Sequence, residues 1–127
     1  MSKYSVMPTF KFSDEDMLDI ISSAVYDIGY WVCIDNDTDE WNQTSDSMDD
    51  DHTFEDVFYA ILKSGHSVQL IDVEDSDEVW DLTFDKLLNG IKLSIENKHW
   101  DGDVDSLDGE VGDIIFQYAL FNEIVYG

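Results

Sequence analysis

The sequence contains no arginine, and only six lysines carry a full positive charge. Opposite them stand 30 aspartate and glutamate residues, which give the 127-residue chain a formal net charge of -24. Proteins bind nucleic-acid phosphates mainly through Arg and Lys, and the lysines here form no basic patch: Lys3, Lys11, Lys63, Lys86, Lys92 and Lys98. The charge therefore argues against direct binding of nucleic acid or of an anionic membrane, and it favours basic partner surfaces.

Cysteine and long apolar runs are also scarce. The one cysteine, Cys33, has no second cysteine with which to form an internal disulfide. No apolar run approaches the ~20 residues that a membrane span needs, and no signal-peptide pattern is present. We expect a cytoplasmic protein.

Catalytic and cofactor-binding motifs are missing too. The sequence has no G-x-S-x-G elbow, no P-loop and no dinucleotide fingerprint. Cys33, His52, His66 and His99 lie too far apart for the short ligand spacings of zinc sites. We predict that the protein is not an enzyme and that it needs no cofactor or metal.

Two aspartate triplets match the start of a calcium-binding loop, namely Asp35, Asp37 and Asp39, and Asp101, Asp103 and Asp105. Such a loop needs glycine at its sixth position and a bidentate glutamate at its twelfth. Those positions hold Glu40 and Asp46 in the first match, and Ser106 and Gly112 in the second. The aspartates are therefore interpreted as turn formers and solvated surface, with weak adventitious divalent binding left open.

The composition predicts a folded protein, because 43% of the residues are hydrophobic and 13% are aromatic. The length favours a single domain over residues 1–127. Residues 67–95 are its organising unit: an apolar run, an acidic turn and a second apolar run predict a β-hairpin. Thr83 then caps a helix, since apolar residues recur at helical spacing from Phe84 to Ile95.

The remaining elements follow from the same signals. Helices are predicted after Ser13 up to Gly29, after Thr53 up to Gly65, and over 111–121, with apolar residues 124–126 docked behind the last helix. A buried strand is expected over 30–34, and an edge strand around Pro8 over 4–12. The resulting fold class is α+β, a small mostly antiparallel sheet with a central hairpin, packed by about four helices.

Two polar stretches connect these elements. Residues 35–52 are expected to form a long, flexible acidic loop, and residues 97–109 a second polar connection. Trp31 and Trp80 belong to apolar strands and are expected in the core. Trp41 and Trp100 lie in the acidic stretches, where each would be either an exposed interface anchor or a side chain folded back over the core.

The acidic residues are spread over most of the predicted elements, and aspartate outnumbers glutamate 22 to 8. A rigid surface of closely spaced carboxylates can occupy a DNA-binding groove, since duplex DNA carries one negative charge per ~1.7 Å of its axis. The predicted partner-binding residues are Trp41, Asp46, Asp49, Asp50, Asp51, Asp72, Glu74, Asp75, Asp77, Glu78 and Trp100. Solubility, or adaptation to high salt, is the alternative explanation of the charge. Lysine without arginine, with abundant Ile and Asn, indicates AT-rich coding and speaks against a GC-rich halophile.

Three segments carry a resemblance: Gly29, Tyr30 and Trp31, then VWDLTFDKLLNGIKL (79–93), then DIIFQYALFNEIVYG (113–127). They resemble blocks in an uncharacterised family of small acidic proteins from phages and prophages of Firmicutes. The resemblance implies a shared fold, a mobile-element origin and residence in the host-cell cytoplasm.

By analogy, a small acidic phage protein without catalytic motifs looks like an inhibitor of a host nucleic-acid enzyme, of the anti-CRISPR, anti-restriction or glycosylase-inhibitor kind. Its partner would be a basic nucleic-acid-binding protein, with a CRISPR effector nuclease as one example. The alternative is a phage structural or assembly accessory that binds another protein through an apolar patch around Trp41 or Trp100, or forms a homodimer through its last helix.

Overall fold

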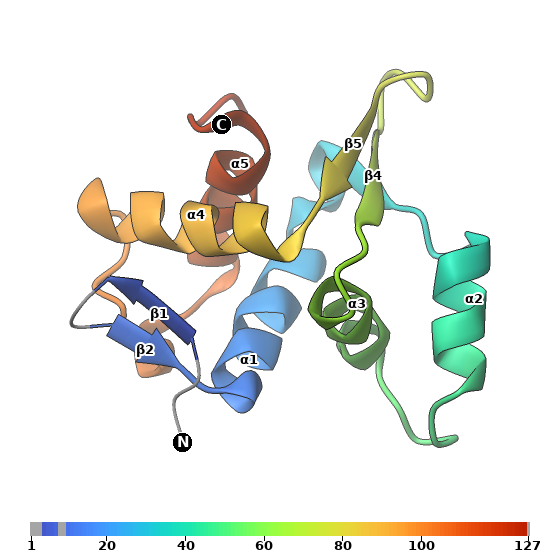
Figure 1. The fold of residues 1–127 in the computed structure, drawn as a ribbon. Coiled ribbons are helices and arrows are strands. Elements are labelled where there is room, and N and C mark those ends of the chain that lie inside the picture. Colours follow the sequence, from blue (N-terminus) through green and yellow to red (C-terminus); the bar gives the residue numbers. More distant parts are fainter. Residues whose placement is uncertain (1–3, 8–9, 127) are drawn as a thin grey trace.

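Helix α5 (Gly109–Phe121) forms the centre of the helical part of the computed structural model, which describes residues 4–7 and 10–126 (Figure 1). It packs against α4 (Phe84–Glu96) and α1 (Asp14–Val25). Glycines set how closely these helices approach. A Cβ on Gly90 of α4 would stand 2.4 Å from the Ile115 carbonyl oxygen, and one on Gly112 would stand 2.6 Å from the Ala24 nitrogen. No exposed apolar side chain is left on α5.

The central sheet has the antiparallel strand order β3-β4-β5, formed by Val32–Ile34, Val68–Asp72 and Val79–Leu82. Its inner face carries Val68, Leu70 and Leu82, which are almost fully buried. Helix α3 (Phe54–Lys63) packs beside β4, and α5 packs beside β5. The predicted hairpin of β4 and β5 is therefore confirmed, and so is the helix that follows it.

The predicted α+β fold class is confirmed, with five α-helices in the described part of the chain. The N-terminal region differs from the single expected edge strand. Strands β1 (Tyr4–Met7) and β2 (Phe10–Phe12) form a separate antiparallel pair, and Pro8 lies outside the described residues. Among the helices described, none has both the length and the apolar character needed to cross a membrane.

Three predicted helix caps are present. The side chains of Ser13, Thr53 and Thr83 each accept a hydrogen bond from a backbone N–H in the first turn of their helices. Helix α1 nevertheless ends at Val25, short of Gly29, and a 3-10 turn over Ile28–Tyr30 follows it. That turn buries Ile28, so the helix-like apolar spacing continues past the true helix end. The predicted buried strand over 30–34 is accordingly shortened to Val32–Ile34, and it is only partly buried, because it lies at the edge of its sheet and Cys33 is exposed.

The expectation of a loop over residues 35–52 is wrong, because α2 (Asp39–Asp46) lies within it. The Thr38 side chain caps this helix by accepting from the Trp41 N–H at 3.1 Å, and Asp39 and Glu40 occupy the first turn. Acidic residues there favour a helix because they meet the positive end of its dipole. One aromatic side chain, Trp41, provides the buried contact of the helix, which is too little for apolar periodicity to reveal.

The second polar connection contains a 3-10 turn, Val104–Ser106. Beyond α5, the C-terminal segment is docked as predicted. The Gln117 side-chain oxygen accepts from the N–H groups of Val125 and Tyr126 at 2.8 Å each. The Tyr126 ring stacks on Trp31, with 4.9 Å between ring centroids. The Ile124 and Val125 side chains remain exposed, so the tail is held mainly through its backbone and Tyr126.

Candidate functional site

The predicted acidic binding residues form two separate groups. We call Asp72, Glu74, Asp75, Asp77 and Glu78 the hairpin acids, and Asp46, Asp49, Asp50 and Asp51 the loop acids. All are exposed except Asp72, which is half-buried. The β4–β5 turn and the segment between α2 and α3 lie at opposite ends of the same side of the molecule (Figure 1). The structure therefore does not bring the two groups together into one continuous surface.

The hairpin acids are held by local hydrogen bonds. Asp72 Oδ1 accepts from the Glu74 N–H at 2.8 Å, and Asp75 Oδ1 accepts from the Asp77 N–H at 3.1 Å. The backbone closes the turn, since the Asp72 N–H donates to the Glu78 carbonyl at 3.0 Å. Aspartate suits such positions because its short side chain can bond the backbone two residues further on. The same residues thus shape the turn and supply its charge.

The base of the hairpin also contacts the C-terminal tail. The Tyr126 hydroxyl donates to Asp72 Oδ2 at 3.5 Å. Burial raises the pKa of Tyr126, and the charges of Asp72, Glu74 and Glu78 raise it further. Three hairpin acids therefore lie close enough to act on one phenol. No ion pair in the described part of the chain involves a hairpin acid, so this concentrated negative charge has no internal cation.

The loop acids have a different support. His52 Nδ1 donates to the Asp49 carbonyl, and His52 Nε2 bonds the Ser45 hydroxyl at 2.9 Å. These bonds tie the segment after α2 back to the helix. The carboxylates of Asp49, Asp50 and Asp51 remain exposed. The group is acidic, but its side chains have fewer ordering contacts than those of the hairpin acids.

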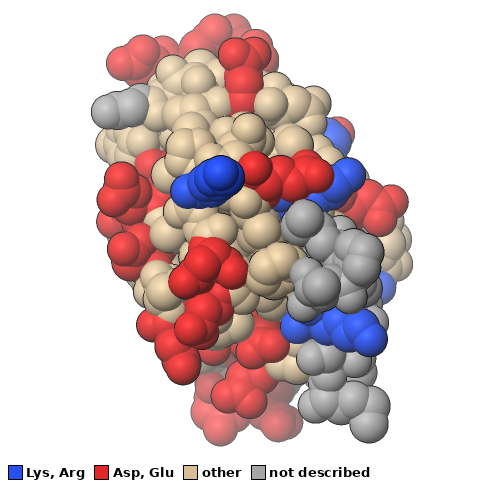
Figure 2. Space-filling model, turned by 90° about the vertical axis from the view of Figure 1, so that its left-hand side faces the viewer, with Lys and Arg blue, Asp and Glu red and all other residues tan. Residues whose placement is uncertain are grey.

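The negative charge is not confined to these two groups. Figure 2 shows the left-hand side of Figure 1, where carboxylates surround the face and lysines lie among them. The hairpin acids and the loop acids belong to elements on the opposite, right-hand side of Figure 1. The lysines therefore lower the net negative charge of the face that Figure 2 shows.

Trp41 and Trp100 were each expected to be either an exposed interface anchor or a side chain folded over the core. Both fold back onto the core. Trp41 is 6% exposed and Trp100 is 4% exposed. Trp41 lies against Phe54, with ring centroids 4.7 Å apart, and Trp100 stacks on Phe12 at 5.7 Å. An interface anchor needs an accessible ring, so the assignment of Trp41 and Trp100 to a partner-binding surface is wrong. The sequence did not predict this burial because both tryptophans have acidic neighbours in the chain.

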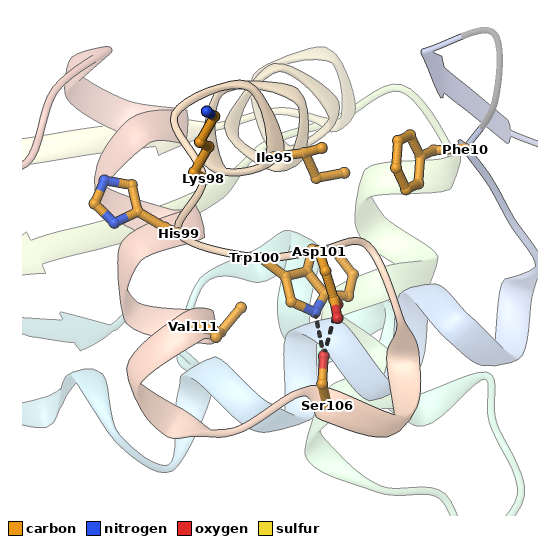
Figure 3. Close-up of a pocket in the computed structure, with 8 residues that line it drawn as sticks. All are labelled: Phe10, Ile95, Lys98, His99, Trp100, Asp101, Ser106 and Val111. Atoms are coloured by element: carbon orange, nitrogen blue, oxygen red, sulfur yellow. Dashed lines mark hydrogen bonds between the residues drawn. The ribbon is translucent and has the colours of Figure 1, made fainter.

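The hollow beside Trp100 is lined by the residue types of a hydrolase triad, Asp101, His99 and Ser106, but His99 lies apart from the other two (Figure 3). The Ser106 hydroxyl donates to Asp101 Oδ1 at 2.9 Å and accepts from the indole N–H of Trp100 at 3.0 Å. The His99 ring instead contacts Tyr118, with 5.8 Å between ring centroids. No histidine of the described chain contacts the Ser106 hydroxyl, and the bonds that this hydroxyl makes to Asp101 and to the Asp103 carbonyl hold the turn.

The second calcium-like triplet lies in the same turn. Asp101 Oδ1 accepts from the Asp103 N–H, and Asp103 Oδ1 accepts from the Asp105 N–H, both at 2.9 Å. The first of these bonds, with the Ser106 hydroxyl, lowers the pKa of Asp101. In the first triplet, Asp35 Oδ1 likewise accepts from the Asp37 N–H at 3.1 Å. Among the described residues, no three His, Cys, Asp or Glu side chains are grouped to hold a metal ion.

Sequence reasoning did not predict the polar network around the buried carboxylate of Asp113. This carboxylate is 8% exposed and accepts from three side chains: the Tyr30 hydroxyl at 2.5 Å, the Trp31 indole N–H at 2.8 Å and the Gln117 amide at 3.0 Å. Gln117 in turn holds the C-terminal tail. The network joins the 3-10 turn, α5 and the tail, and its role is therefore structural.

The network predicts how stability depends on pH. Tyr30 is 54% exposed, but the partial desolvation of its hydroxyl and the hydrogen bond to Asp113 raise its pKa from 10.0 to about 12. The folded protein thus holds this proton more tightly than the unfolded chain. The resulting stabilisation is complete below pH 10 and is lost as the pH rises through about 12. The wild-type minus Tyr30→Phe difference in tyrosinate absorbance should titrate near the raised value. A difference that titrates at the ordinary tyrosine pKa would contradict the network.

Comparison of the chain with protein-family models, with curated proteins and with solved structures gives no match. The resemblance to phage and prophage proteins thus stays a prediction.

Proposed function

We propose that the protein is a non-enzymatic acidic accessory protein of a phage or prophage. It acts as a DNA mimic in the host cytoplasm and inhibits a basic nucleic-acid-binding protein, as anti-CRISPR or anti-restriction proteins do. One observation carries the proposal. The hairpin acids place five carboxylates on one hydrogen-bonded turn, with no internal cation among the described residues.

Rigid placement supports mimicry because a DNA-binding groove is built for charges at fixed positions. Asp72 lies next to Glu78 across the hairpin, and Glu74, Asp75 and Asp77 fill the turn between them. Arginine and lysine side chains that pair with DNA phosphates would pair equally well with these carboxylates.

The hairpin is also a better candidate than the loop acids. Two of its carboxylates, those of Asp72 and Asp75, accept backbone hydrogen bonds that fix their directions, whereas the loop is held through His52 and the backbone of Asp49. Charges that are already ordered lose less conformational entropy on binding. We assign the partner-binding role first to Asp72, Glu74, Asp75, Asp77 and Glu78.

The alternative, a structural or assembly accessory that binds another phage protein through an apolar patch, has to use another surface. Trp41 and Trp100 are buried, and α5 is enclosed by its neighbours, so neither the tryptophans nor the last helix offers the patch. Exposed apolar side chains do occur at Tyr26, Val73 and Val79. These side chains could form the apolar patch that this alternative requires.

A charge-neutralised hairpin should bind the partner about tenfold more weakly, equivalent to about 1.4 kcal/mol. The variant is Glu74→Gln, Asp75→Asn, Asp77→Asn and Glu78→Gln, which leaves the half-buried Asp72 intact. Its matched control neutralises the same number of charges in the loop: Asp46→Asn, Asp49→Asn, Asp50→Asn and Asp51→Asn.

Columns carrying the wild type and each variant would receive the same lysate of a Firmicutes host and be eluted with a salt gradient. We expect DNA-binding proteins identified by mass spectrometry to leave the hairpin-variant column at lower salt than the other two. Equal elution from both variant columns would show that total charge, and not the hairpin, determines binding.

A further inference from the structure

Strand β3 presents a free edge. It pairs with β4 on one side only, and in the described chain no strand lies on its other side. The Asp35 N–H donates to Gln69 and the Trp31 carbonyl accepts from Val73, so these odd-numbered positions face β4. Because main-chain groups alternate along an antiparallel strand, those of Val32 and Ile34 point outward, where the Ile34 carbonyl meets the Cys33 thiol at 3.8 Å. Natural edge strands are commonly blunted by shortness, charged side chains or proline; β3 is short, at three residues, but contains no charged residue and no proline.

An apolar hollow of about 520 Å³ borders this edge. It is lined by Val32 and Ile34 of β3, by Tyr26 and Ile28 after α1, and by Phe54 and Val73. Its volume lies within the ~300–1,000 Å³ range of ligand-sized pockets. Tyr26 is 75% exposed and Val73 is 46% exposed, so the hollow opens to solvent. Its apolar walls would take side chains from an added strand.

The charge beside the hollow is negative. The Tyr26 hydroxyl donates to Glu55 Oε1 at 3.4 Å, Asp35 follows Ile34, and Glu74, a hairpin acid, follows Val73. None of the lining residues is basic. A second copy of this chain would bring another charge of -24 to the same edge, and like charges oppose such pairing. A segment rich in lysine and arginine would instead be attracted to this negative edge.

We propose that the free edge of β3 binds an extended, basic segment of the partner protein as a fourth strand. The backbone of that segment pairs with Val32 and Ile34, its alternate apolar side chains enter the hollow, and its lysines or arginines lie beside Asp35, Glu55 and Glu74. Such strand addition combines main-chain affinity with side-chain specificity. The proposal rests on the proposed function for the basic character of the partner.

The test uses a defined probe, an acetylated and amidated octapeptide that alternates lysine and valine. Proton–nitrogen NMR of the labelled protein should show shifts concentrated at Tyr26, Val32, Ile34 and Val73, and the Ile34 amide should exchange roughly tenfold more slowly. The same peptide with alternate backbone nitrogens methylated, and a glutamate–valine peptide, should give neither effect. Shifts spread over the whole acidic surface, or equal binding of the methylated peptide, would overturn the proposal.

Two serine variants locate the site. Val73 and Val79 are both 46% exposed, but only Val73 lines the hollow. Val73→Ser should weaken peptide binding at least about threefold, and Val79→Ser should leave it unchanged; equal effects would reject the hollow. Concentration-dependent shifts at β3 without peptide would identify a second copy as the occupant and overturn the proposal. Neither a nuclease nor DNA is present in this experiment. A negative result would therefore reject strand addition at β3 without rejecting the DNA-mimic proposal, which the column experiment tests.

Discussion

Trp41→Ala should lower the free energy of unfolding by about 3–5 kcal/mol, the range for removing a buried aromatic side chain. Trp41 is 6% exposed and lies between α2 and the aromatic rings of Phe54 and Phe58 on α3. Its loss leaves a cavity and removes the buried contact of α2. Urea unfolding followed by far-ultraviolet circular dichroism measures the effect.

The matched control for this substitution is Tyr26→Ala. Tyr26 is also a large aromatic residue, but it is 75% exposed, so its removal should change stability by no more than about 0.5 kcal/mol. A Trp41→Ala protein as stable as the wild type would mean that the indole is not part of the core. Trp41 would then be better interpreted as an exposed interface anchor.

Gly90→Ala should destabilise the protein by about 1–3 kcal/mol. In an ordinary helix position this substitution would stabilise by about 1 kcal/mol, because alanine has the higher helix propensity. Here the new Cβ would stand 2.4 Å from the Ile115 carbonyl oxygen and 2.9 Å from the Ala119 Cβ. Helices α4 and α5 must separate to admit it, and the sign of the effect is therefore reversed.

Gly29→Ala is the control for this second prediction. A Cβ at Gly29 meets no atom within 4 Å, so the substitution should be nearly neutral in the same urea titration. If Gly90→Ala were as stable as Gly29→Ala or more so, the close packing of α4 on α5 would be wrong.

Much of the fold was predictable from local signals. The hairpin of β4 and β5 follows from two apolar runs around an acidic turn, and α3 and α4 follow from Thr53 and Thr83 ahead of apolar residues at helical spacing. In these segments the local preference and the tertiary contacts agree. The predicted elements were therefore found at nearly their predicted bounds.

Helix α2 was missed because its signal is mainly polar. Thr38, Asp39 and Glu40 are a helix start, but Trp41 is the helix's one buried side chain. A single aromatic in an acidic stretch gives no periodicity, and whether it is buried depends on where α3 lies. The burial of Trp100 against Phe12 could not be predicted for the same reason: it depends on where a distant segment lies.

The candidate site was predictable in residue type but not in arrangement. The sequence marks Asp49 and Asp75 as equivalent members of an acidic surface, whereas the structure places them on segments at opposite ends of one side (Figure 1). The hollow beside β3 combines Tyr26, Phe54 and Val73 from three distant segments. Local patterns carry no information about such proximity.

The most direct test of the account is competition between duplex DNA and this protein for the same partner. A DNA-binding protein captured from the host lysate would be titrated with duplex DNA at low and at high salt. The account predicts that DNA displaces the partner from the immobilised protein and that affinity falls steeply as salt rises, because the contact is made by exposed charges. A partner that DNA cannot displace, bound equally well at both salt concentrations, would contradict DNA mimicry.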